Sequence, residues 1–74
     1  MTDEIVKELT RIDAPYGRKI VLESVDHASG LRLLRIRLRE GSRFTVLDID
    51  DETAVRWSTA MSAWAGQSPH SLDE

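Results

Sequence analysis

The chain has no cysteine among its 74 residues, which excludes disulfide bridges and thiolate metal sites. Aromatic residues make up only 5%, and no apolar run approaches the ~20 residues of a membrane-spanning helix. Acidic residues precede the first apolar ones, which is not the pattern of a secretory signal peptide. We therefore expect a cytoplasmic protein with no membrane segment.

The sequence also lacks an excess of positive charge, since its net charge is −3. A protein that holds duplex nucleic acid by bulk positive charge is therefore disfavoured. The length fits one domain, expected over residues 1–66 and followed by a flexible polar tail over residues 67–74. Chains below about 80 residues often need disulfides, a metal or a partner subunit. Without cysteine, we expect a homodimer.

Residues 1–13 allow two predictions. Helical spacings of three and four recur at Ile5, Val6, Leu9 and Ile12, whereas residues 7–12 also alternate as an edge strand would. Both alternatives stay open at this point. Pro15 and Gly17 then break the chain, because proline fixes φ and glycine permits positive φ.

From residue 18 to residue 49 the hydrophobic period is two, which predicts strands at about 19–26, 31–39 and 42–48. A three-residue loop at residues 28–30 pairs Glu23 with Arg35 and Leu22 with Ile36, so charges and apolar residues match together. A second loop over residues 39–41 would pair Ile36 with Phe44 and Leu34 with Val46. A two-residue Glu40-Gly41 turn would instead set Phe44 against Arg37, but glutamate is a poor first residue for such a turn, which needs positive φ there.

The last element is predicted to be a helix. Asp50 is a good N-cap, and Gly66 is a plausible stop. An apolar stripe recurs every three or four residues at Ala54, Trp57, Met61 and Trp64. The fold class is therefore α+β, a three- or four-stranded antiparallel meander with a C-terminal helix packed on one face.

The helix is expected to cover one sheet face, formed by Ile20, Leu22, Leu34, Ile36, Leu38, Phe44 and Val46. The opposite face is too apolar to be fully solvated, so either the N-terminal segment or another chain should cover it. The helix tryptophans fit the core, and they also fit a dimer seam. The candidate interface residues are Val21, Val25, Leu33, Leu47, Trp57 and Trp64.

No residue pattern predicts catalysis, a metal site or a cofactor. His27 lies at a turn and His70 in the tail, and nothing positions either of them for acid–base chemistry. Acidic residues cluster between Asp48 and Glu52, where helix capping explains them. We therefore expect a non-enzymatic protein without a small-molecule substrate.

The third strand is rich in arginine. The candidate binding residues for an anion or a nucleic acid are Arg35, Arg37, Arg39 and Arg43. A solvated face, with Arg35 neutralised by Glu23, explains the same residues. Stacking platforms for single strands normally carry several aromatics, and Tyr16 is the only one outside the expected core.

Four segments carry a resemblance: residues 11–18, residues 27–41, residues 43–50 and the Trp57–Trp64 spacing. They resemble a family of small proteobacterial proteins of unknown function, which implies no activity. The strands and the tryptophan-bearing helix are also similar to the single-stranded-DNA-binding domain of the transcriptional positive-cofactor type. That resemblance implies dimerisation through helices and DNA binding on the sheets, although its lysine-rich glycine segment has no counterpart here.

These observations favour a non-enzymatic binding module with an unknown protein partner. The alternative is a single-stranded nucleic-acid binder that uses the arginine-bearing sheet face. The two differ in their response to salt, because binding to a phosphate backbone weakens steeply as salt is added.

Overall fold

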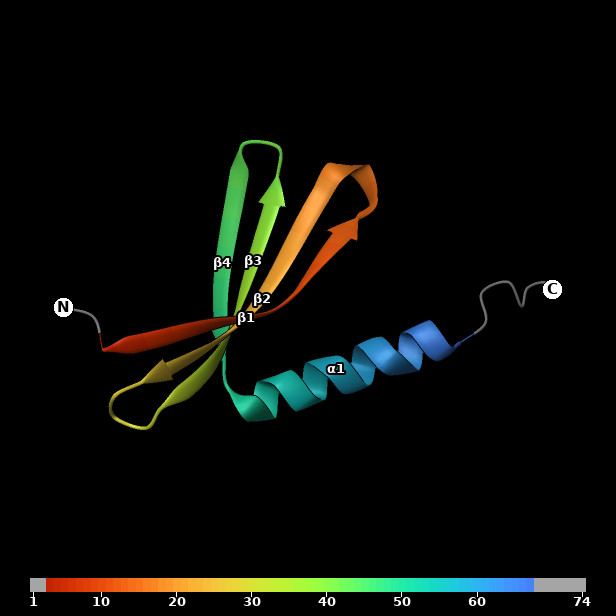
Figure 1. Cartoon of the computed structure of the whole chain (residues 1–74). Helices are drawn as coiled ribbons and strands as arrows, with labels where there is room; N and C mark the ends of the chain where they lie inside the picture. The colour runs from red at the N-terminus through yellow and green to blue at the C-terminus, as the bar shows by residue number, and fades with distance from the viewer. Residues whose placement is uncertain (1–2, 68–74) are drawn as a thin grey trace.

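A computed structural model describes residues 3–67 as one open sheet followed by one α-helix (Figure 1). The sheet is an antiparallel meander in the order β1-β2-β3-β4, which confirms the α+β class. The elements are β1 (Glu4–Ala14), a short 3-10 turn (Pro15–Gly17), β2 (Arg18–His27), β3 (Arg32–Glu40), β4 (Arg43–Ile49) and α1 (Asp51–Gly66).

The N-terminal segment is a strand, which decides between the two alternatives for residues 1–13. β1 lies in the plane of the sheet and pairs with β2 along its whole length. The pairing register shifts between Glu8 and Thr10, so Leu9 forms a β-bulge. A bulge changes which side chains share a face, because it interrupts the alternation of the strand. Ile12 therefore lies opposite Ile20.

The first predicted hairpin register is confirmed. Glu23 lies opposite Arg35 and Leu22 opposite Ile36 in the β2–β3 ladder. The His27 amide donates to the Leu31 carbonyl oxygen at 2.8 Å, which closes the loop. Gly30 has φ of 94°, a conformation that glycine adopts without a steric cost.

The second predicted hairpin register is wrong. The loop is the two-residue Gly41-Ser42 turn, which sets Ile36 opposite Leu47 and Arg37 opposite Val46. Gly41 has φ of 62° and stands at the first central position, as a type II′ turn requires. Phe44 and Val46 consequently leave the face predicted for them, and Leu47 takes their place beside Ile36.

The helix begins at its predicted cap. The Asp50 Oδ1 atom accepts a hydrogen bond from the Thr53 amide at 2.9 Å, and hydrogen bonding with Thr53 lowers the pKa of Asp50. Asp51 and Glu52 occupy the first turn, where the helix dipole favours acids. Gly66 is the last helical residue, but the C-cap is Gln67 in an extended conformation.

The helix covers less of the sheet than the sequence predicted. It contacts β3 near its own first turns and then runs away from the strands (Figure 1). Trp57 is 37% exposed and Trp64 is 75% exposed, so neither tryptophan is buried on its own sheet. Within residues 3–67, the buried hydrophobic side chains are Val25 and Ile49. His70 and all of the predicted tail but Gln67 lie outside the described residues.

Candidate interaction surfaces

The pairing registers divide the side chains between two faces of the sheet, because alternate residues of a strand point to opposite sides. One of them, here called the aliphatic face, lies on the side of α1 and is dominated by leucine and isoleucine. Its charged side chains lie at strand ends or on the edge strand β1. The aliphatic members are Ile5, Leu9, Ile12, Ile20, Leu22, Leu34, Ile36, Leu38, Leu47 and Ile49.

Much of the aliphatic face is open. Ile5, Leu9, Ile12 and Leu47 are all exposed, and the more central members other than Ile49 are only half-buried. Soluble monomers rarely expose a contiguous apolar surface larger than a few hundred Å². A face of this composition is therefore typical of an interaction surface.

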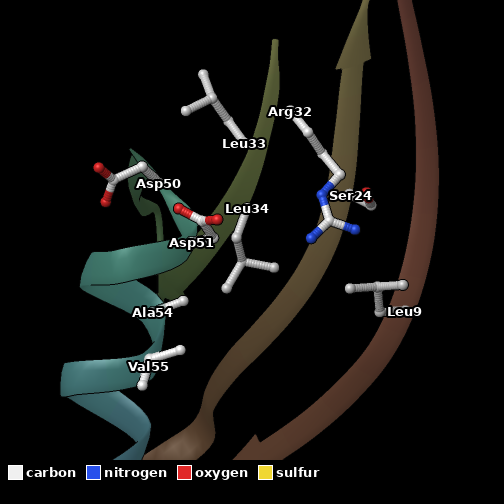
Figure 2. A pocket seen from close by; sticks show the side chains of 9 residues that line it. All are labelled: Leu9, Ser24, Arg32, Leu33, Leu34, Asp50, Asp51, Ala54 and Val55. Carbon is white, nitrogen blue, oxygen red and sulfur yellow. The ribbon is translucent and has the colours of Figure 1, made fainter. Parts of the chain in front are cut away.

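A groove of about 270 Å³ marks the place where α1 leaves the sheet (Figure 2). Leu9 and Leu34 line its sheet side, and Ala54 and Val55 line its helix side. Arg32 and Asp51 also line the groove, and Figure 2 shows the Arg32 side chain between Leu34 and Leu9. The groove is open to solvent. It forms the narrow end of a wedge-shaped gap, here called the wedge, that widens between α1 and the aliphatic face.

The other face, here called the ionic face, has balanced charge. It carries five acidic and five basic side chains, and most of them form ion pairs with one another. The charged members are Glu4, Glu8, Arg11, Asp13, Lys19, Glu23, Arg35, Arg37, Arg39 and Asp48.

Arg35 anchors the ionic face. Its Nε donates to Asp48 Oδ1 at 2.8 Å and its Nη2 to Asp48 Oδ2 at 3.0 Å, which is a bidentate pair. The Arg35 side chain is only 17% exposed, and Glu4 lies 3.8 Å from its Nη1. These hydrogen bonds raise the pKa of Arg35 and lower the pKa of Asp48. The expected partner Glu23 faces Arg35 across the ladder but binds Arg37 instead.

The other arginines of the candidate binding site differ in their surroundings. Arg37 Nε donates to Glu23 Oε1 at 2.8 Å. Arg39 Nε donates to the Gly41 carbonyl oxygen at 3.1 Å, and its guanidinium lies 5.7 Å from the centre of the Phe44 ring. Arg43 lies opposite Glu40, on the aliphatic side of the sheet. The four predicted arginines therefore do not form one surface, because the two-residue turn places Arg43 on the other face.

The candidate interface residues are divided in the same way. Val21, Val25 and Leu33 belong to the ionic face, and Leu47 belongs to the aliphatic face. Val25 is fully buried within the chain, so it offers no surface to a partner. Leu47 is exposed on the aliphatic face, and Trp57 and Trp64 are exposed on α1.

Sequence reasoning missed two features of these surfaces. Ile12 joins Ile5 and Leu9 on the aliphatic face because of the bulge in β1, for which the sequence has no recognisable signal. Phe44 is exposed beside Arg39 because of the Gly41-Ser42 turn. The glycine-serine dipeptide was the available signal, since glycine followed by a small polar residue is typical of a two-residue hairpin turn.

His27 is half-buried, with Nε2 3.8 Å from Glu4 Oε2. Over residues 3–67, no three histidine or acidic side chains are grouped as metal ligands would be. In the same part of the chain, no helix combines the length and apolarity that crossing a membrane requires.

Comparison with known proteins assigns the family. Residues 3–67 match a family of unknown function, DUF6967, so this α+β chain belongs to that family. No curated protein and no solved structure matches the chain.

Proposed function

We propose that this protein is a non-enzymatic interaction module that binds a protein surface through its aliphatic face. The observation that carries the proposal is the aliphatic face itself, on which leucines and isoleucines from all four strands remain open or half-buried. Burial of apolar area stabilises association by about 25 cal/mol per Å² before the entropic costs of binding. On the ionic face, the exposed apolar side chains Val46 and Phe44 alternate with paired charges, which makes that face the weaker candidate.

Two adjacent residues on β4 allow a matched test. Leu47 lies on the aliphatic face and is 45% exposed, and Val46 lies on the ionic face and is 53% exposed. The test titrates a fluorescent dye that binds apolar surfaces against the protein. The protein is diluted to roughly tens of nanomolar, because dilution disfavours self-association by mass action. We expect Val46→Glu to keep dye binding at the wild-type level and Leu47→Glu to lose most of it. Equal dye binding by the two variants would contradict the proposed function.

A second candidate function is single-stranded nucleic-acid binding on the ionic face, as the similarity to the positive-cofactor type implies. The favouring observation is the exposed Phe44 ring beside Arg39, because exposed aromatics with arginine form stacking platforms for bases. The ion pairs of Arg35 and Arg37 weigh against it, since their charge is already neutralised.

Titration of a single-stranded oligonucleotide at low salt tests this second candidate. If the ionic face binds nucleic acid, affinity should fall steeply with salt and should fall again in Phe44→Ala. Unchanged binding in Phe44→Ala would rule out this platform.

The bacterial origin, proteobacterial in particular, and the cytoplasmic location expected from the sequence stay predictions.

A further inference from the structure

The helix α1 is chemically unlike a solvated helix. Its charged residues are Asp51, Glu52 and Arg56, and residues 57–66 carry no charge at all. The apolar stripe of α1, defined as Ala54, Trp57, Met61 and Trp64, is largely exposed. A helix in water normally sets charged residues opposite its apolar stripe. The uncharged part of α1 therefore has the composition of a helix that packs against another apolar surface.

The chain cannot cover this stripe with its own sheet in the observed arrangement. Asp50 alone connects β4 to α1, and its capping bond to Thr53 holds the direction of the first turn. The Ala54 amide also donates to the Asp50 carbonyl oxygen at 3.0 Å. Because the junction is this short, α1 leaves the sheet at the wedge instead of lying flat on it (Figure 1).

The overall dimensions show how much surface this leaves. The Cα radius of gyration is 15.4 Å, whereas a compact domain of 74 residues has about 11 Å. The accessible surface is 5996 Å², against roughly 4,600 Å² for a compact monomer of 8.4 kDa. Within residues 3–67, Met61 at 57% and Trp64 at 75% exposed show that part of this open surface lies on α1.

We propose that the missing partner is a second copy of this chain, with α1 of each copy lying on the aliphatic face of the other. The inference rests on the proposed function, because it names the occupant of that same face. One chain carries both complementary parts: a largely uncovered aliphatic face, and a helix whose residues 57–66 are uncharged and diverge from that face. A twofold axis then covers both parts of both copies with the same contact.

The sizes of the two parts agree. The 16 residues of α1 extend about 24 Å. The outer strands of a four-stranded sheet lie about 14 Å apart, and the strands here run for 7 to 11 residues, or about 23 to 36 Å. The helix therefore fits on the aliphatic face without extending past the strand ends. Trp57 and Trp64 supply the large aromatic anchors that dominate such interfaces.

The first part of the test measures the molar mass of the full chain by light scattering. The protein concentration is raised from about 1 to about 100 µM, because mass action favours association at the higher concentrations. We expect twice the 8.4 kDa of one chain. Met61→Glu in the helix and Leu47→Glu in the sheet should each weaken association by about tenfold or more. Thr59→Glu, on the other side of α1, and Val46→Glu should stay at the wild-type level.

Mixing the two weakened variants tests the reciprocal arrangement. A mixed pair contains one intact contact, between the helix of the Leu47→Glu chain and the face of the Met61→Glu chain. The mixture should therefore associate more strongly than either variant alone, which also shows that both variants are folded. A seam made by two helices predicts that Leu47→Glu associates normally and that mixing gains nothing, and this result would overturn the proposal.

Failure of this inference is distinguishable from failure of the proposed function. A monomeric wild-type chain at the highest concentration, with dye binding that Leu47→Glu removes, would overturn the second-copy proposal and leave the interaction module standing. A monomeric chain whose aliphatic face binds no dye at any dilution would overturn both.

Discussion

The two faces of the sheet differ in how their side chains interact with one another and with water. On the ionic face, acidic and basic side chains pair with one another, so most of the charge on this face is neutralised within the chain. On the aliphatic face, leucines and isoleucines meet across the strands and leave apolar area open to water. Charge can be neutralised within one chain by local pairs, whereas apolar area is removed from water only by covering it. This difference is the basis for proposing the aliphatic face as the binding surface.

The largest expected effect contrasts one aliphatic side chain from each face. Val25 is 0% exposed on the ionic face, and Leu47 is 45% exposed on the aliphatic face. Val25→Ala should lower the free energy of unfolding by about 2 kcal/mol, because it removes buried methyl groups. Leu47→Ala should cost less than about 1 kcal/mol in chains kept dilute enough to be monomeric.

Urea denaturation followed by tryptophan fluorescence measures both. At high concentration the Leu47→Ala loss should grow, because the association that it weakens also stabilises the fold. A dilute Leu47→Ala chain that is as unstable as Val25→Ala would show that the face is buried within one chain.

The next effect concerns the strongest pair of the ionic face. Removal of either Arg35 or Asp48 should lower the free energy of unfolding by about 1 kcal/mol, because the pair is bidentate and partly shielded from water. A double-mutant cycle with Arg35→Ala and Asp48→Ala isolates their coupling. Additive losses would mean that the two side chains act independently. Arg35→Ala with Asp13→Ala is the matched control, and it should be close to additive because Asp13 pairs with Lys19 instead.

The same pair predicts a dependence on pH. The hydrogen bonds from Arg35 lower the pKa of Asp48 in the folded chain, so the carboxylate contributes stability above its unfolded pKa. That contribution is lost as the pH falls below about 4 and through the folded pKa. The wild-type chain should therefore lose more stability than Asp48→Asn between neutral pH and strongly acidic pH, as measured by thermal melting. Parallel pH profiles would contradict the role of this pair.

The smallest expected effect is the exposed pair on the same face. Arg37 is half-exposed and pairs with Glu23. Glu23→Gln should cost about 0.5 kcal/mol or less, and the loss should shrink in high salt because the pair is accessible to counterions. A loss larger than that of the Asp48 variants would reverse the ranking of the two pairs.

The accuracy of the sequence-based expectations differs between the two hairpins. The β2–β3 register was predictable because opposite charges and apolar residues matched in a single alignment. The β3–β4 register was not, because β4 offers fewer charges to match and the loop was placed at residues 39–41 instead of Gly41-Ser42. That error moved Phe44 and Val46 to the wrong face. It also hid the pairing of Leu47 with Ile36, and with it the place of Leu47 on the aliphatic face.

The sequence by itself determined the local structure: the strand pattern of β2 and β3, the Asp50 cap, the stripe of α1 and the absence of cysteine. Each follows from interactions within a few residues or from a period of two or of three to four. Only the tertiary structure decided the bulge at Leu9, the partners of Arg35 and Arg37, and the divergence of α1 from the sheet. These features depend on which strands become neighbours and on the junction at Asp50. Contacts between residues distant in the sequence are set by the packing of the whole chain, which local periodicity does not encode.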